Sequence, residues 1–154
     1  MKNLFSLKES EIKEGENIPD VELLNSKGNK VQLSNYPEWK VIYFYPKDNT
    51  PGCTIEAQTF SSFTDEFAEK GVKIFGINQD STESHSKFSE KNKLNFELLT
   101  DPKGQLAKVL GVKILFGLCS RDTFLIDDQN NLIKVYRNFS PKNGPTKLLE
   151  ELEI

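Results

Sequence analysis

The sequence predicts an α/β domain in which a mixed β-sheet is covered by helices on both faces. Hydrophobic runs with the composition of buried strands alternate with segments whose apolar residues recur at helical spacing. That alternation is typical of a sheet with helices packed on both sides. The last two strand-like runs are separated only by a short polar turn, which predicts an antiparallel pair and therefore a mixed sheet.

Length and composition fit one globular domain over residues 1–154. A chain of 154 residues can bury a sizeable core, and the hydrophobic and charged fractions are ordinary. Lysines are scattered and the net charge is −3, so a nucleic-acid partner is not expected. The first 20 residues lack the apolar core of a signal peptide, and the longest apolar run, Val41 to Tyr45, is too short to span a membrane. We expect a cytoplasmic protein with no membrane partner.

The first half of the chain predicts a turn, a buried strand and a helix. Residues 25–30 form a hairpin or meander turn, and the β-branched and aromatic run "KVIYFYP" (residues 40–46) is a strand buried on both faces. A helical pattern follows and stops at Gly71. The apolar residues of its buried face are Cys53, Ala57, Phe60, Phe63 and Phe67.

The second half continues the alternation. Residues 72–78 form a second buried strand, and Asp80 with Glu83 gives a capping-box signal for a helix to about Lys93. The remaining elements are a short strand (95–101), a short helix (104–111), a hairpin (121–127 with 131–137) and a closing helix (143–154). The order β-α-β-α-β-α-β-β-α fits a thioredoxin-like architecture, although periodicity does not separate it from other three-layer folds.

The segment "NTPGC" places a thiol where a helix begins. Thr50 is the expected N-cap and Pro51 the first helical residue, so Cys53 lies in the first turn. Unpaired backbone N–H groups and the helix dipole favour a thiolate there, and the thiolate is the nucleophilic form. The alternative interpretation is a buried apolar cysteine at the start of the helix's inner face.

Two other side chains suit a reactive thiolate. Thr50 lies three residues before Cys53, so the turn can bring its hydroxyl close to the sulfur. A thiolate that attacks an electrophilic oxygen also needs a permanent cation, for which arginine is well suited. Arg121, one of only two arginines, opens an apolar strand; the alternative is an ordinary charge at a strand end.

The segment "FYPKDNTPGCT" contains Pro-x-x-x-Thr-x-x-Cys, formed by Pro46, Thr50 and Cys53, and it resembles the motif of peroxiredoxins. The segments "GINQDSTESHSKF" and "SRDTFLIDDQNNLIKVY" are similar to the peroxiredoxin Q branch, also called bacterioferritin comigratory protein, and the similarity begins near Gly15. This resemblance implies a thioredoxin-like fold and a thiol-dependent peroxidase that uses no cofactor or metal and reduces hydrogen peroxide and organic hydroperoxides.

The resemblance also implies roles for individual residues. Cys53 would be the peroxidatic cysteine, which becomes a sulfenic acid, and Thr50 and Arg121 would activate it and hold the peroxide. Pro46 would shield the pocket. Glu56 matches a Glu or Gln position that orients the arginine; the alternative is a solvated helix face. The partners implied are a peroxide and a thiol reductant such as thioredoxin, a glutaredoxin system or a low-molecular-weight thiol.

The usual positions of a second, resolving cysteine are occupied by Gln58 and Ser89. We therefore expect a one-cysteine mechanism, and the resemblance favours a monomer over a dimer. Cys119 is the alternative resolving residue: if the strand of Arg121 extended to it, both side chains would share a face. A disulfide requires Cα atoms within about 7 Å. Otherwise Cys119 is a small buried apolar residue.

Two alternative functions and one histidine complete the sequence-based expectations. A thiol–disulfide oxidoreductase is disfavoured because the chain has no CxxC motif, and a redox sensor does not need the full Pro-Thr-Cys-Arg set. His85, the only histidine, lies away from the cysteine motif on a predicted helix. We interpret it as a structural or surface residue, and a single histidine argues against a histidine-based metal site.

Overall fold

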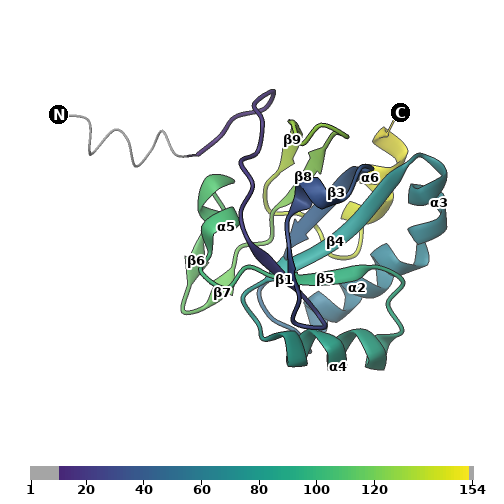
Figure 1. The fold of residues 1–154 in the computed structure, drawn as a ribbon. Coiled ribbons are helices and arrows are strands. Elements are labelled where there is room, and N and C mark those ends of the chain that lie inside the picture. Colours follow the sequence, from purple (N-terminus) through teal and green to yellow (C-terminus); the bar gives the residue numbers. More distant parts are fainter. Residues whose placement is uncertain (1–10, 153–154) are drawn as a thin grey trace.

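The computed structural model describes residues 11–152, which form a seven-stranded mixed sheet with helices on both faces (Figure 1). Pairing is parallel in the centre, between β5, β4 and β3, and antiparallel elsewhere. In spatial order the strands are β2 (Lys30–Val31), β1 (Leu23–Asn25), β5 (Glu97–Thr100), β4 (Val72–Asn78), β3 (Trp39–Phe44), β8 (Thr123–Ile126) and β9 (Leu132–Tyr136).

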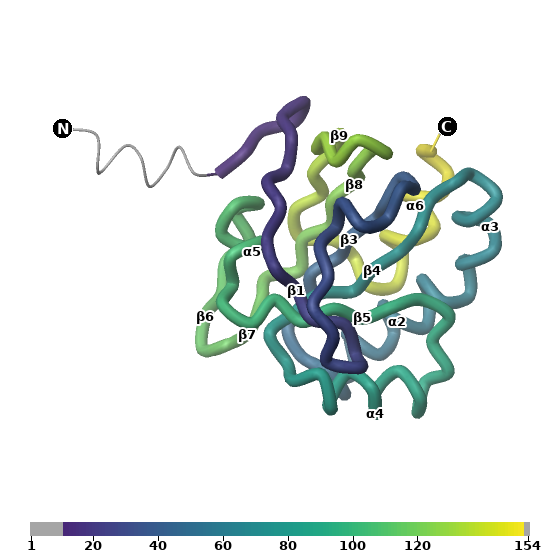
Figure 2. The backbone as a smooth tube through the Cα atoms, in the orientation of Figure 1, coloured from purple at the N-terminus to yellow at the C-terminus, as the bar shows by residue number. Residues whose placement is uncertain are grey.

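The helices divide between the two faces of the sheet. One face is covered by α2 (Pro51–Ser62), α3 (Thr64–Glu69), α4 (Thr82–Asn92) and α6 (Gly144–Glu151). The other is covered by α5 (Gln105–Val109), the 3-10 turn η1 (Leu33–Asn35) and the segment before β1, which runs past α5 (Figure 2). Within residues 11–152, none of these helices is long and apolar enough to cross a membrane.

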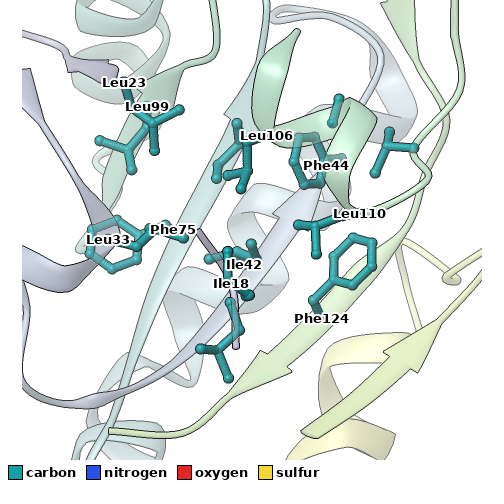
Figure 3. Packing of buried hydrophobic residues seen from close by; sticks show 14 of the residues in the cluster. Ile18, Leu23, Leu33, Ile42, Phe44, Phe75, Leu99, Leu106, Leu110 and Phe124 are labelled. Atoms are coloured by element: carbon teal, nitrogen blue, oxygen red, sulfur yellow. The ribbon is translucent and has the colours of Figure 1, made fainter. Parts of the chain in front are cut away.

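The central strands are buried on both sides, as their sequences predict. Ile42 and Phe44 of β3 point into one hydrophobic cluster, which also contains Phe124 and the α5 residue Leu106 (Figure 3). Their neighbour Tyr43 points into the second cluster, beneath α2, α4 and α6. Because side chains alternate along a strand, consecutive residues of β3 serve opposite cores. The cluster with Tyr43 also contains Cys53, so it is called the Cys53 side below.

The structure confirms most predicted elements and divides one of them. The turn at residues 25–30 joins β1 to β2, and the strand predicted over 72–78 is β4. The helix expected to reach Gly71 is interrupted at Phe63, between α2 and α3. Thr59, Ser62 and Thr64 each donate a side-chain hydrogen bond to a carbonyl three or four residues back, a pattern that bends helices.

The capping box predicted for α4 is wrong. The N-cap is Ser81, whose hydroxyl accepts from the amide of Ser84 at 3.1 Å. The Asp80 carboxylate instead accepts from the amide of Asp48 at 2.7 Å. The helix ends at Asn92 with Lys93 as its C-cap, close to the predicted end. Asp80 therefore connects two segments that are distant in sequence.

A short hairpin before β8 is absent from the sequence-based elements. It consists of β6 (Ile114–Leu115) and β7 (Leu118–Cys119), which pair outside the main sheet. The strand that follows, β8, begins only at Thr123. Cys119 and Arg121 therefore lie outside a common strand, and the condition for their sharing a face is not met.

Candidate active site

Cys53 lies in the first turn of α2, as the sequence predicts. Thr50 is the N-cap, with extended backbone, and Pro51 opens the helix. The Cys53 side chain is almost fully buried, with 1% of its surface exposed, and it faces the Tyr43 cluster. The thiol therefore sits beside the unpaired amides of a helix N-terminus, where negative charge is stabilised.

The guanidinium of Arg121 joins Cys53 to Glu56. Its Nη2 lies 3.6 Å from the Cys53 Sγ, and its Nη1 donates to the Glu56 Oε1 at 2.6 Å. A Cβ atom on Gly52 would lie 3.3 Å from Nη2, so the guanidinium passes closely over the first turn of α2. The structure thus brings together residues that are 68 positions apart in the chain.

Arg121 is held by its backbone and by its neighbours. Its carbonyl accepts from the amide of Phe139, and the carbonyl of Asp122 accepts from the amide of Phe44, both at 2.8 Å. The Asp122 carboxylate pairs with Arg137 at 2.9 Å. The segment between β7 and β8, which carries Arg121, is therefore hydrogen-bonded to β3 and to the segment after β9. These bonds fix the direction from which Arg121 reaches the thiol.

Burial and charge compete at this site. Burial raises the pKa of Glu56 to about 8, although the charge and hydrogen bond of Arg121 oppose the shift. Its second oxygen, Oε2, lacks a hydrogen-bond partner among the described residues. Burial alone would lower the pKa of Arg121, but Glu56 and Cys53 raise it above its ordinary value. The guanidinium therefore stays charged, and Glu56 is buried rather than on a solvated helix face.

Thr50 and Pro46 belong to the loop that precedes α2. The Thr50 hydroxyl donates to the carbonyl of Lys47 at 2.9 Å and does not cap the helix. Its bonds within residues 11–152 do not include Cys53, so the hydroxyl oxygen remains free to accept from another group. Pro46 is partly exposed, two residues after β3 ends at Phe44. Both motif residues are therefore partly exposed in the loop that leads to Cys53.

The profile of the AhpC/TSA family matches residues 15–135. The chain belongs to the AhpC/TSA family. It is 42% identical over 147 residues to Peroxiredoxin Bcp of Bacillus subtilis, covering 90% of this chain and 94% of that one. It is 36% identical to Peroxiredoxin Bcp of Escherichia coli, covering 92% of this chain and 96% of that one.

Solved structures agree with this assignment. Peroxidoxin BcpB from Mycobacterium tuberculosis superposes with a TM-score of 0.83 at 34% identity, over 90% of this chain and 95% of that one. Xylella fastidiosa PrxQ gives a TM-score of 0.84 at 28% identity, over 92% and 96% of the chains. The predicted thioredoxin-like fold and the Bcp/PrxQ branch of the peroxiredoxins are confirmed. The protein is a thiol peroxidase. Its similarity to peroxiredoxins favours this function over a thiol–disulfide oxidoreductase or a redox sensor.

The second cysteine of this peroxiredoxin lies on the other side of the sheet. Cys119 is 3% exposed and packs in the cluster of Phe44 and Leu106, whereas Cys53 packs in the opposite cluster. Burial raises the Cys119 pKa to about 12, with further contributions from three carboxylates, chiefly Asp101. Cys119 therefore has the surroundings of a buried apolar residue, and a bond to Cys53 requires rearrangement of the fold.

The usual resolving positions lie on the Cys53 side of the sheet. Gln58 is exposed on α2, and its side-chain amide donates to Asn92 at the end of α4 at 3.1 Å. Ser89 is partly exposed on α4. Neither side chain carries a thiol, so the described surface of these two helices offers no internal reductant for Cys53. Among residues 11–152, acidic, histidine and cysteine side chains do not gather into a group that could hold a metal ion.

His85 and Asp48 form a buried pair that the sequence did not indicate. His85 is fully buried on α4, so it is not a surface residue, and its Nδ1 lies 2.8 Å from the Asp48 Oδ2. Asp48 belongs to the motif segment, five residues before Cys53. The one available signal was that His85 precedes Phe88 by three residues, which places both on one helix face.

Proposed function

We propose that the Cys53 thiolate is the nucleophile with which this peroxiredoxin reduces hydrogen peroxide and organic hydroperoxides. The observation that carries the proposal is the guanidinium of Arg121, which reaches Cys53 with one nitrogen and Glu56 with another. Because the guanidinium is held next to the Cys53 sulfur, it is also held next to the peroxide oxygen that the sulfur attacks. Such preorganised donors account for much of the rate enhancement of enzymes.

The reaction is a displacement at oxygen. The Cys53 sulfur attacks the terminal peroxide oxygen, an S–O bond forms, and the O–O bond breaks. The sulfur is oxidised to a sulfenic acid, and the leaving hydroxide or alkoxide takes a proton from solvent to become water or an alcohol. Arg121 and the amides of the helix N-terminus stabilise the charge as it moves to the leaving oxygen. Thr50 holds the peroxide by its hydroxyl, and Pro46 limits access of water.

Cys53 is then reduced by an external thiol in a one-cysteine mechanism. The thiol attacks the sulfenic acid, water leaves, and a mixed disulfide forms; a second thiol releases the Cys53 thiolate. This mechanism is supported by the identity of Gln58 and Ser89 and by the burial of Cys119 across the sheet. The reductant is a thioredoxin, a glutaredoxin system or a low-molecular-weight thiol, and the enzyme works as a monomer in the cytoplasm.

Peroxide consumption with dithiothreitol as the reductant tests this mechanism. We expect Cys53→Ser to abolish consumption, because serine is not ionised at neutral pH. We expect Cys119→Ala to retain the wild-type rate within about twofold, because the loss of a small buried group affects stability rather than chemistry. Unchanged turnover in Cys53→Ser would exclude Cys53 as the nucleophile, and loss of turnover in folded Cys119→Ala would support the alternative in which Cys119 resolves the sulfenic acid.

A further inference from the structure

Asp48 is the buried member of the loop that leads from β3 to the active-site cysteine. Its neighbours Lys47 and Asn49 are exposed, whereas 4% of Asp48 is accessible. Three side chains donate to its carboxylate: Tyr45 at 2.5 Å, Ser84 at 2.7 Å and the Nδ1 of His85 at 2.8 Å. Two of these donors belong to the first turn and a half of α4, so the loop is attached to that helix by its carboxylate.

The charge of Asp48 is stabilised by these donors. Burial alone would raise the pKa of Asp48, but the hydrogen bond and charge of His85, with the hydroxyls of Tyr45 and Ser84, hold it below its ordinary value. An ionised carboxylate only accepts hydrogen bonds, so Nδ1 of His85 donates. A buried carboxylate that loses such a donor is left with an unpaired charge, which is costly.

The backbone of the same residue is attached to the sheet. The amide of Asp48 donates to the Asp80 Oδ2 at 2.7 Å. Asp80 lies two residues after the end of β4, and it exchanges hydrogen bonds with Asn78, the last residue of that strand, at 2.8 and 3.2 Å. Both the amide and the carboxylate of Asp48 are therefore tied to groups at the end of β4 and the start of α4.

Asp48 stands midway between the two motif residues of the loop. Pro46 lies two residues before it and Thr50 two residues after it. The intervening Asn49 has a φ of 66°, a conformation that turns the chain sharply before the helix begins. Because so few bonds separate Asp48 from Thr50, a displacement of the Asp48 carboxylate would also displace Thr50, the N-cap residue of α2, together with its hydroxyl.

We propose that Asp48 and His85 are positioning residues of the peroxidase, through which α4 holds the loop from Pro46 to Thr50 in the geometry that receives peroxide. The proposal rests on the proposed function of Cys53. α4 has its own N-cap at Ser81 and its own apolar anchor at Phe88, whereas the loop has Asp48 as its one buried side chain. Loss of the pair should therefore displace the loop more than the helix.

Two rate constants separate positioning from a structural role. The first is the second-order rate constant of Cys53 with hydrogen peroxide, and the second is that of Cys53 with iodoacetamide, which needs the thiolate but not the peroxide pocket. Asp48→Asn removes the charge with little change of shape. Asp101→Asn is the matched control, because Asp101 is also a buried carboxylate but caps α5 on the opposite face of the sheet.

We expect Asp48→Asn and His85→Leu to lower the peroxide rate constant by about tenfold or more. The iodoacetamide rate constant should stay within about twofold of wild type, because a displaced loop slows only the reaction that depends on the position of its residues. His85→Asn, whose amide can donate from the position of Nδ1, should recover to within about threefold of wild type. Asp101→Asn should leave both rate constants within about twofold.

A peroxide rate constant that stays at the wild-type value in folded Asp48→Asn, or a parallel fall of both rate constants, would overturn the proposal. Should the Asp48 and His85 variants fail to fold, Ser84→Ala removes one donor from the partly exposed side, and a peroxide rate constant identical to wild type would overturn the proposal equally. A wild-type protein whose Cys53 does not react with peroxide would overturn the proposed function itself.

Discussion

At the residue scale, the candidate active site depends on the guanidinium of Arg121, which contacts both Cys53 and Glu56. Arg121 is directed at Cys53 by Glu56 on one side and by the loop anchored at Asp122 on the other. An ammonium group has no planar fork, so a lysine at this position could not contact both partners in the same way. The position of the charge, rather than its presence alone, is therefore what the site provides.

Arg121→Lys tests this point. We expect the rate constant of Cys53 with hydrogen peroxide to fall by about 100-fold, the loss typical of removing one preorganised donor to a transition state. Stopped-flow competition against a peroxidase of known rate would measure it. Lys134→Ala, which breaks an exposed ion pair with Glu151, is the control. A rate for Arg121→Lys equal to that of the control would show that any cation suffices.

Glu56 should make stability depend on pH. Its pKa rises from 4.5 to about 8 in the folded protein, so between these values the folded state keeps a proton that the unfolded state releases. The stabilisation from this group is present below its ordinary pKa and is lost as the pH rises towards 8. In urea unfolding of the reduced protein, Glu56→Gln should lose less stability than wild type between pH 5 and about 8. Parallel profiles for the two proteins would contradict the assignment.

Prediction at the residue scale succeeded where the relevant residues are local or carry a motif. Thr50 and Cys53 are three positions apart, so helix-capping rules were enough to place the thiol. Arg121 was found because an arginine at the start of an apolar strand is unusual. His85 was placed away from the site because its partner, Asp48, is 37 residues away, and their contact exists only when α4 packs beneath the loop.

At the element scale, the β6–β7 hairpin has an unfavourable turn. Phe116 and Gly117 form its turn with φ values of 54° and 77°, a conformation that suits glycine and asparagine but is strained for phenylalanine. Phe116 is 92% exposed, so its side chain gains little from packing. Two-residue strands give no periodic signal, which explains why the sequence did not predict them.

Phe116→Asn should therefore stabilise the protein. We expect the free energy of unfolding to rise by about 1 kcal/mol, the order of the penalty for a left-handed residue other than glycine or asparagine. Urea unfolding followed by circular dichroism would measure the change. Phe116→Ala removes the same ring without the asparagine side chain and should show little or no gain. Equal stabilities of the two variants would contradict the interpretation.

At the scale of the whole molecule, the sheet separates the two cysteines. Alternation along β3 and β8 divides the buried side chains into two clusters, with Cys53 in one and Cys119 in the other. The order of strands and helices was predictable from periodicity, because long buried strands and amphipathic helices are strong local signals. Periodicity did not predict the side of the sheet on which Cys119 lies. That side depends on where β8 begins and on the hairpin before it.

The intact mass of the protein under non-reducing conditions, after stoichiometric hydrogen peroxide in the presence of dimedone, tests the central claim most directly. The account predicts one dimedone adduct, located at Cys53 by peptide mapping, with Cys119 still a free thiol. Loss of two hydrogens and a peptide that links Cys53 to Cys119 would contradict the one-cysteine mechanism. A Cys53 that stays unmodified would contradict its assignment as the nucleophile.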